Sequence, residues 1–251
     1  MSFWDEKIRS IGARVQGLGR ALEQPGRLRR RLTGSHLDEE VLAFAARPYV
    51  RAGEVRTIFD VGANEGQFAR TALRAFPAAR LICFEPLQSA QQALGLVVAE
   101  NRGRVEVENV ALGDQNGEID FNVATFSPSS SVLPLDQQDV VAMEMATTTR
   151  VPIRRLSDWA ATKSIEREII VKLDVQGYEA PVLRGAIDLL KKTRIVIAET
   201  CFAPLYKGQA TLGELCAILE PLGLLYREAY GVIRDPRSSE PLWQDSIFVR
   251  K

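Results

Sequence analysis

Short apolar runs alternate with stretches of helical periodicity from residue 57 onward. The apolar runs have the length of buried strands, and the stretches between them repeat apolar residues at the spacing of a helix. We predict strands at 57–61, 79–84, 104–110, 168–175 and 194–198, and helices at 65–76, 88–101, 179–191 and 212–222. Strands that alternate with helices form right-handed βαβ units whose neighbouring strands run parallel. The pattern therefore predicts an α/β fold with a parallel sheet.

The alternation is interrupted after the third of these strands. We predict an extra strand at 119–124, a return strand at 150–154, a helix at 156–162, and two final strands at 224–229 and 246–250. Residues 125–149 have little periodicity and contain the run Ser127-Pro128-Ser129-Ser130-Ser131. A loop of this length inside a compact domain is usually functional or mobile. We predict a lid with Ser130 and Ser131 near a bound ligand, and a plain disordered insertion is the alternative.

The first 50 residues differ from the rest of the chain. Apolar residues recur along one face of a predicted helix, namely Trp4, Ile8, Ile11, Val15, Leu18 and Leu22. Gly12, Gly17 and Gly19 each weaken a helix by up to about 1 kcal/mol relative to alanine, so this helix needs a partner. Packing on the protein's own domain, a homodimer seam and an anionic membrane surface are open alternatives. We divide the chain into a helical extension, 1–50, and one α/β domain, 51–251.

Length and charge limit the classes of function. The chain has 251 residues, 46% of them hydrophobic, which is enough for one large core. Basic and acidic side chains both number 32, so the whole molecule has no electrostatic preference for nucleic acid. Residues 1–35 carry a net charge of +5, but no aromatic residue lies between their basic side chains. We therefore expect no nucleic-acid partner.

The cysteines and the apolar runs bear on location. Cys83, Cys201 and Cys216 lie in or beside predicted core elements and lack the short spacing of metal ligands. We expect reduced thiols, which are typical of the cytoplasm. The sequence has no signal-peptide pattern at its start and no 18-residue apolar run, so no transmembrane segment is expected. The predicted location is cytoplasmic.

The most informative segment is Asp60-Val61-Gly62-Ala63-Asn64-Glu65-Gly66, between the first predicted strand and the helix after it. Gly62 permits a positive φ or the close approach of a ligand, and Gly66 permits close packing of the helix on the strand. The free N–H groups of the helix's first turn face the ligand. The spacing differs from the Gly-x-Gly-x-x-Gly dinucleotide fingerprint, and an acid at Asp60 would repel a phosphate. That acid suits a ligand with an ammonium or sulfonium charge, such as S-adenosylmethionine.

Acidic residues stand at or just past the ends of several predicted strands. Glu85 lies 25 residues beyond Asp60, close to the separation of about 20 residues at which nucleoside-binding folds place their ribose acid. The loop Ala111-Leu112-Gly113-Asp114 suits adenine held between apolar groups with a polar partner at its edge, and a simple turn is the alternative. Asp174 and Glu199 follow two later strands. Because ligands bind beyond the carboxyl ends of the strands in open α/β sheets, this shared placement predicts one site.

An ordered series of segments resembles the FkbM family of S-adenosylmethionine-dependent O-methyltransferases. The segments are Asp60 to Gly66, Phe84-Glu85-Pro86, Asn109 to Asp114, Lys172-Leu-Asp-Val-Gln-Gly-Tyr-Glu179 and Val182-Leu-Arg-Gly185. The resemblance covers roughly residues 55–250, and the series is much more specific than any one member. One position departs from the family, because its usual Lys-x-Asp-x-Glu-Gly has Gln176 in place of the Glu.

The resemblance implies a fold and an activity. The implied fold is a doubly wound, Rossmann-like class I methyltransferase sheet that is mostly parallel, with an antiparallel last strand. The implied activity is transfer of a methyl group to a hydroxyl of a sugar, a glycan or a polyketide-like natural product. The cofactor would be bound by Asp60, Gly62, Ala63, Asn64, Gly66, Glu85, Pro86, Ala111, Leu112 and Asp114.

Asp174 and Lys172 are the predicted catalytic residues. Asp174 would take the hydroxyl proton or position a metal. Lys172 would pair with Glu85 or Asp174, and the alternative is that it only satisfies a buried carboxylate. Ser130, Ser131, Tyr178 and Tyr206 are predicted to line the acceptor site.

Metal dependence stays open in this reading. Asp174 and Glu199 are candidate Mg²⁺ ligands, because Mg²⁺ favours carboxylates completed by water and substrate. Gln176 is neutral where the family pattern has a charged Glu, which argues against a bound metal. A nicotinamide-dependent reductase and a non-catalytic nucleoside-binding or scaffold protein are the alternative functions.

Overall fold

The computed structural model describes residues 35–124, 130–134, 145–202, 206–234 and 238–251, and the predicted helix at residues 4–22 lies outside these ranges. Within the described ranges, no helix is long and apolar enough to cross a membrane.

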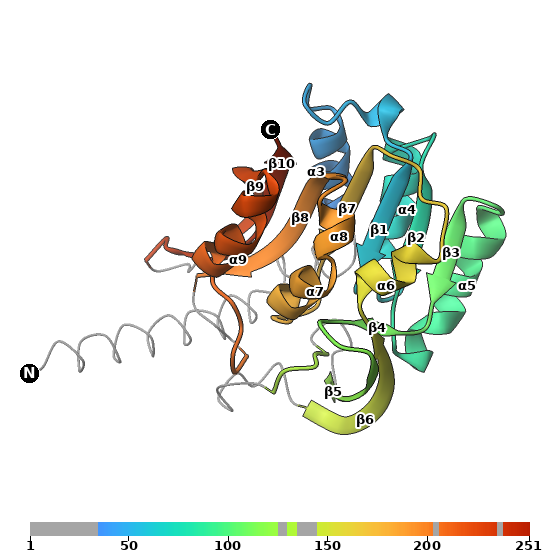
Figure 1. The fold of residues 1–251 in the computed structure, drawn as a ribbon, viewed down its shortest axis with the longest axis vertical. Coiled ribbons are helices and arrows are strands. Elements are labelled where there is room, and N and C mark those ends of the chain that lie inside the picture. The colour runs from blue at the N-terminus through green and yellow to red at the C-terminus, as the bar shows by residue number, and fades with distance from the viewer. Residues whose placement is uncertain (1–34, 125–129, 135–144, 203–205, 235–237) are drawn as a thin grey trace, which may run out of the picture.

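A seven-stranded sheet forms the centre of the fold (Figure 1). In spatial order its strands are β3 (Val105–Glu108), β2 (Arg80–Phe84), β1 (Thr57–Val61), β7 (Ile169–Leu173), β8 (Thr193–Cys201), β10 (Pro241–Arg250) and β9 (Leu224–Arg234). The strands from β3 to β8 run parallel, and β10 runs antiparallel to both β8 and β9. The prediction of a doubly wound, mostly parallel sheet with an antiparallel last strand is confirmed.

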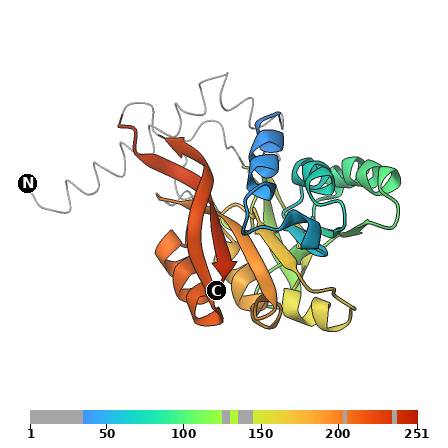
Figure 2. The same ribbon diagram turned by 90° about the horizontal axis from the view of Figure 1, so that it is seen from above.

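Helices cover both faces of this sheet (Figure 2). One face carries α3 (Ser35–Ala45), α4 (Gln67–Ala75) and α5 (Gln91–Glu100), and the other carries α6 (Leu156–Ala161), α7 (Glu179–Gly185), α8 (Ile187–Leu190) and α9 (Leu212–Leu219). Short 3₁₀ turns lie at η1 (Ala52–Glu54), η2 (Gln88–Ala90) and η4 (Glu220–Leu222). Each face of the sheet therefore has its own hydrophobic core.

The alternation of side chains along β1 and β7 decides where the polar residues of these strands point. In β1, Ile58 belongs to the core under α4, and Phe59 belongs to the core under α7. The next residue, Asp60, therefore points back to the α4 side. Lys172 is the register partner of Asp60 in β7 and points the same way. Two ionisable side chains thus meet inside a sheet that is buried on both faces.

The order of the strands reverses between β1 and β7. From β1 the chain moves outward through β2 to β3, and it later returns to place β7 on the other side of β1. In open α/β sheets, ligands bind beyond the carboxyl ends of the strands at this kind of switch point. Val61 and Leu173, the paired last residues of β1 and β7, mark that point.

A second, three-stranded sheet lies beyond the carboxyl ends of the main strands (Figure 1). Its order is β4 (Ala111–Leu112), β6 (Met145–Arg154) and β5 (Gly117–Ala124), with β5 and β6 antiparallel. The sequence pattern predicted strands at 119–124 and 150–154 but not a separate sheet. The prediction of a loop as far as residue 149 is wrong for 145–149, which pair with β5. Residues 125–129 and 135–144 of the predicted lid lie outside the described ranges.

The helix predicted at 179–191 is two helices, α7 and α8, which meet at Ala186. The reason is a contact between distant parts of the chain. A Cβ on Gly185 would lie 1.8 Å from the carbonyl oxygen of Gly113, so the end of α7 sits directly on the backbone of the loop after β4. Ser157, in the first turn of α6, accepts a hydrogen bond from the N–H of Asp188 in α8 at 3.1 Å. The local pattern of apolar residues in the sequence indicates neither of these two contacts.

The last two strands are longer than predicted. β9 continues to Arg234 instead of ending at residue 229, and β10 begins at Pro241 instead of at residue 246. Their pairing contains register irregularities, one of them between Trp243 and Asp245. A bulge shifts the alternation of side chains by one position, which hides the strand from a two-residue pattern.

Helix α3 lies within the predicted N-terminal extension and packs on the core. The side chains of Val41 and Phe44 are buried. The ring of Phe44 lies 6.3 Å from that of Phe76 and 6.2 Å from that of Tyr230, measured between centroids. The division of the chain at residue 50 stays a prediction.

Candidate active site

The turn after β1 joins the ends of three strands. The N–H groups of Gly62 and Ala63 both donate to the carbonyl of Phe84 at the end of β2, at 3.0 and 3.1 Å. Gly62 has a φ of 76°, and a Cβ on it would lie 1.9 Å from the carbonyl oxygen of Asp174. Glycine is required because the left-handed φ and the neighbouring backbone both exclude a side chain. The ends of β1, β2 and β7 are thereby held together.

The second half of the turn positions Asn64 and starts helix α4. Asn64 has a φ of 46°, and Gly66, the N-cap of α4, has a φ of 82°. A Cβ on Gly66 would lie 3.0 Å from Cγ2 of Val97 and 3.2 Å from Cδ2 of Leu94, both in α5. The prediction that Gly66 packs the helix on the preceding strand is therefore corrected, because the close neighbour is helix α5.

Glu85 is held in place at the end of β2. Its Oε2 accepts from the N–H of Asn64 and its Oε1 accepts from the N–H of Leu87, both at 2.9 Å. Burial raises the pKa of Glu85, and these two hydrogen bonds oppose that shift. A carboxylate has about four acceptor positions, so two further donors can still bind. Two vicinal hydroxyl groups of a ribose are donors of the right kind. Pro86, also predicted to bind the cofactor, follows it and is partly exposed.

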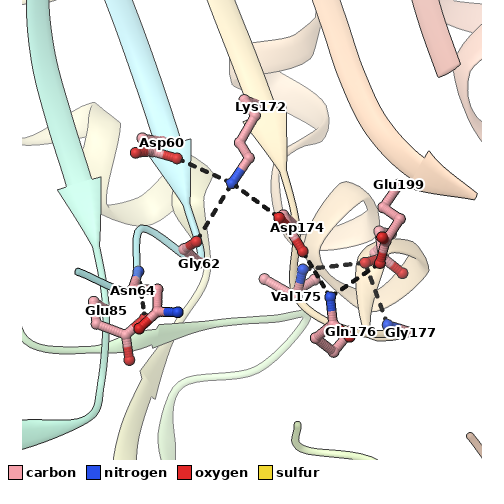
Figure 3. A network of polar contacts seen from close by, with 11 residues as sticks. Asp60, Gly62, Asn64, Glu85, Lys172, Asp174, Val175, Gln176, Gly177 and Glu199 are labelled. Atoms are coloured by element: carbon pink, nitrogen blue, oxygen red, sulfur yellow. Dashed lines mark hydrogen bonds and ion pairs between the residues drawn. The ribbon is translucent and has the colours of Figure 1, made fainter. Parts of the chain in front are cut away.

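Lys172 lies between two carboxylates at the switch point (Figure 3). Its Nζ is 3.3 Å from Oδ1 of Asp60 and 3.4 Å from Oδ2 of Asp174, and it donates to the carbonyl of Gly62 at 3.4 Å. The same Nζ lies 5.5 Å from the ring centroid of Phe68 in α4. Of the two partners predicted for Lys172, the structure shows Asp174, and it adds Asp60.

The burial of this group differs from residue to residue. Asp60 is 0% exposed and Lys172 is 8% exposed, whereas the side chain of Asp174 is 40% exposed. Burial raises the pKa of Asp60, and the ammonium of Lys172 opposes this shift. Burial alone lowers the pKa of Lys172, but the charges of Asp60 and Asp174 outweigh it and hold that pKa above its ordinary value. Asp174 is therefore the member that a ligand can reach, and Lys172 fixes its position.

Asp60 has a further property that suits a cationic ligand. The ammonium of Lys172 lies 3.3 Å from its Oδ1 as a counter-ion, but among the described residues no hydrogen bond of good geometry reaches either of its buried carboxylate oxygens. Buried carboxylate oxygens normally accept hydrogen bonds, since leaving them without donors costs free energy. One ammonium, that of Lys172, thus faces the carboxyl groups of both Asp60 and Asp174 beside the Gly62 turn, an arrangement that suits a sulfonium or ammonium ligand.

Gln176 links Asp174 to Glu199 (Figure 3). Its Nε2 donates to Oδ1 of Asp174 at 2.8 Å and to Oε2 of Glu199 at 3.0 Å. Its Oε1 accepts from the hydroxyl of Tyr206 at 3.3 Å. Tyr206 is buried, and burial raises the pKa of its hydroxyl, which therefore stays a donor.

The sequence reasoning missed Glu179. This side chain is 2% exposed, and its Oε1 accepts from the N–H of Val175 at 3.1 Å and from that of Gly177 at 3.3 Å. Burial raises the pKa of Glu179 to about 7, against the opposing effect of these hydrogen bonds. The residue belongs to the segment that carries the family resemblance, and its position just after Gly177 and before an apolar helix could have indicated a buried acid.

The residues predicted to line the acceptor site are placed differently from one another. Ser131 donates to the carbonyl of Gln176 at 2.7 Å and accepts from Leu133 N–H at 3.0 Å, so it ties the described part of the insertion to the β7 loop. Ser130 accepts from Ala124 N–H at 3.0 Å. Tyr178 is buried, and its Cε1 would lie 3.1 Å from a Cβ on Gly113. These contacts hold loops and core, and acceptor binding by these residues stays a prediction.

The segment predicted to bind adenine begins with β4, a strand of the second sheet. Ala111 and Leu112 are buried and pair with Ile153 and Arg154 of β6. The carboxylate of Asp114, at the exposed end of this loop, pairs with Nε of Arg184 at 3.1 Å.

The predicted metal site is not supported by the donor set. No group of three or more His, Cys, Asp or Glu side chains that could hold a metal is present among the described residues. Asp174 and Glu199 are close, but the N–H groups of Gln176 occupy the space between them. Amide N–H groups are donors and do not bind cations.

The order of the strands, with Asp60 near the end of β1 and Glu85 directly after β2, defines a class I methyltransferase fold. The Methyltransferase FkbM domain model matches residues 60–228. The chain belongs to the FkbM methyltransferase family.

Two relatives agree with this assignment, and a solved structure agrees with the fold. The chain is 32% identical to the 2-O-methyltransferase NoeI of Sinorhizobium fredii over 192 residues, which are 71% of this chain and 76% of that protein. It is 27% identical to the 31-O-demethyl-FK506 methyltransferase FkbM of Streptomyces tacrolimicus, over 72% of this chain and 78% of that protein. A structure from Galdieria sulphuraria described as a sarcosine dimethylglycine methyltransferase matches with a TM-score of 0.51 at 9% identity, covering 86% of both chains. That last likeness concerns the fold alone.

Proposed function

We propose that this protein is an S-adenosylmethionine-dependent O-methyltransferase that acts on a hydroxyl of a sugar, a glycan or a polyketide-like natural product. The observation that carries the proposal is the group of Asp60, Lys172 and Asp174 at the switch point of a methyltransferase sheet. S-adenosylmethionine supplies an electrophilic methyl group on a sulfonium centre.

The cofactor half of the site is formed by the ends of β1 and β2. Glu85 is oriented by two backbone N–H groups and has acceptor capacity left for the ribose hydroxyls. The Gly62 turn brings the ends of β1 and β7 together, and the buried carboxyl group of Asp60 at this point favours a cationic ligand.

The acceptor half of the site is centred on Asp174. Methyl transfer is an in-line displacement, which requires the acceptor oxygen about 3 Å from the methyl group and the exclusion of water. Asp174 is partly exposed and oriented from two sides, by Lys172 and by Gln176. Its carboxylate is suited to take the hydroxyl proton as that oxygen attacks.

The relatives support a hydroxyl acceptor. NoeI is a 2-O-methyltransferase and the Streptomyces protein methylates a 31-O-demethyl compound, so both act on oxygen. We therefore place this chain among enzymes that methylate oxygen, with Asp174 as the group that receives the proton of the acceptor hydroxyl.

Isothermal calorimetry with S-adenosylmethionine tests the cofactor half. We expect binding by the wild type and a loss of about 10- to 100-fold in Glu85→Gln, because a charged acceptor contributes about 1.5–3 kcal/mol to a hydrogen bond. Glu100→Gln, on the exposed end of α5, is the matched control and should bind as the wild type does. No binding by the wild type would contradict the proposal and favour a non-catalytic protein with this fold. Equal binding by the Glu85→Gln variant would remove Glu85 from the site.

A further inference from the structure

Gln176 makes hydrogen bonds to several parts of the candidate site, through both its backbone and its side chain. Its backbone has a φ of 52°, and its carbonyl accepts from Ser131 of the insertion at 2.7 Å. The N–H groups on either side of it, from Val175 and Gly177, both donate to the buried carboxylate of Glu179. A left-handed backbone is uncommon for a residue other than glycine, asparagine or aspartate, so the surrounding contacts must hold it.

The side-chain amide of Gln176 has one orientation that its neighbours accept. Nε2 has two N–H groups, and the two carboxylates at 2.8 and 3.0 Å use both. In the reversed orientation, Oε1 would face two carboxylate oxygens at hydrogen-bond distance, which is repulsive. The hydroxyl of Tyr206, donating to Oε1 at 3.3 Å, supports the observed orientation from the other side.

Two carboxylates that converge on one point normally need a positive charge between them. At Asp60 and Asp174 this charge is the ammonium of Lys172. At Asp174 and Glu199 the place is taken by a neutral amide with two donors. In the sequence pattern of the resembling family this position is a Glu, which would add a third carboxylate.

We propose that Gln176 is a positioning residue whose amide holds Asp174 and Glu199 where a divalent cation would otherwise bridge them, so that the site orients Asp174 without a metal. The inference rests on the proposed role of Asp174 towards the acceptor. It explains in physical terms why the carboxylates are close and yet do not form a metal site.

Mn²⁺ titration, followed by calorimetry and by electron paramagnetic resonance, tests this inference without cofactor or acceptor. We compare the wild type, Gln176→Glu, Gln176→Met, Glu199→Gln and the double variant Gln176→Glu with Glu199→Gln. Gln92→Glu, which adds the same charge on the exposed face of α5, is the matched control.

We expect the wild type, Gln176→Met and Gln92→Glu to show no site of defined stoichiometry. Gln176→Glu should bind Mn²⁺ at least about tenfold more tightly than the wild type, because affinity rises with the number of ligand charges. Adding Glu199→Gln should remove that gain. If Gln176→Glu does not fold alone, refolding with Mn²⁺ should restore it, since the metal neutralises the three carboxylates.

Three results would overturn the inference. The first is Mn²⁺ binding by the wild type that is lost in Glu199→Gln, which would mean that the amide presents its oxygen. The second is a Gln176→Glu protein with no gain in affinity, and the third is one that Mn²⁺ does not refold. A wild type that binds no S-adenosylmethionine would overturn the proposed function and leave these measurements valid.

Discussion

At the scale of single residues, the site depends on a buried ammonium that neutralises neighbouring carboxylates. Asp60 lies in the interior, where an unpaired carboxylate is costly, and Lys172 is the cation that makes its ionisation tolerable. The same ammonium holds Asp174 at the edge of the site. Lys172 therefore both stabilises the fold and orients Asp174, the proposed base.

Lys172→Met is expected to destabilise the protein by about 3–5 kcal/mol, because it leaves buried Asp60 without its counter-ion. Urea unfolding measures the change. Adding Asp60→Asn should recover much of the loss, since the uncompensated charge is then gone. Lys191→Met, at an exposed pair with Asp188, is the control and should lie within about 0.5 kcal/mol of the wild type. A Lys172→Met protein as stable as the wild type would contradict the ion-pair account.

The raised pKa of Glu179 leads us to expect that the stability of the fold depends on pH. Its pKa is raised from 4.5 to about 7 by burial, so the folded state favours the protonated carboxyl. Its contribution to stability is fully present below about pH 4.5 and is lost as pH rises through 7. The loss amounts to about 3 kcal/mol, at 1.36 kcal/mol for each unit of pKa.

Glu179→Gln removes this titration while keeping an oxygen that accepts the same two N–H groups. The variant should be more stable than the wild type at about pH 8.5 and nearly equal to it at about pH 4, below the unfolded pKa. Urea unfolding at both values provides the test, with exposed Glu220→Gln as control. A stability difference that does not change with pH would show that Glu179 does not titrate in this range.

At the scale of elements, contacts between distant segments explain where helices end. Gly185 and Gly213 both lie in helices, but their surroundings differ. A Cβ on Gly185 would lie 1.8 Å from the Gly113 carbonyl oxygen, whereas a Cβ on Gly213 would have no neighbour closer than 3.9 Å. The same substitution should therefore have opposite effects in the two helices.

Gly185→Ala is expected to destabilise the fold by about 1–3 kcal/mol, because backbone must move to admit the methyl group. Gly213→Ala should stabilise it by about 0.5–1 kcal/mol through helix propensity and a less flexible unfolded chain. Thermal and urea unfolding of both variants measure the two signs. Two changes of the same sign would show that the contact with Gly113 does not decide the break between α7 and α8.

The sequence pattern predicts the main elements well where they are regular and buried. The alternation of strands and helices from residue 57 gave the parallel sheet, and the acids at strand ends marked the switch point. It did not give Asp60 as the partner of Lys172, because that depends on β1 and β7 being neighbours in register.

The remaining features depend on tertiary contacts that no local pattern contains. The break at Ala186 comes from a contact with the loop after β4, and the lengths of β9 and β10 are hidden by register shifts. Gln176 is uncharged, and the sequence showed it only as a departure from the family. Its position between two carboxylates emerges from the fold.

At the scale of the whole molecule, helix α3 joins the predicted extension to the catalytic fold. Phe44 is 1% exposed and contacts rings from two other parts of the chain, whereas Leu42 on the same helix is 45% exposed. We expect Phe44→Ala to cost about 3–5 kcal/mol of stability, as for other buried aromatic side chains. Leu42→Ala, the matched control, should change it by about 0.5 kcal/mol or less. Equal effects in urea unfolding would mean that α3 does not support the domain.

The proposed function depends on one cofactor position, which lies at the carboxyl ends of β1, β2 and β7. A crystal structure with S-adenosylhomocysteine bound tests it most directly. We expect the ribose hydroxyls to bind the carboxylate of Glu85 and the sulfur to lie on the side of Asp174. A cofactor bound away from the Gly62 turn, or with its ribose remote from Glu85, would contradict the account.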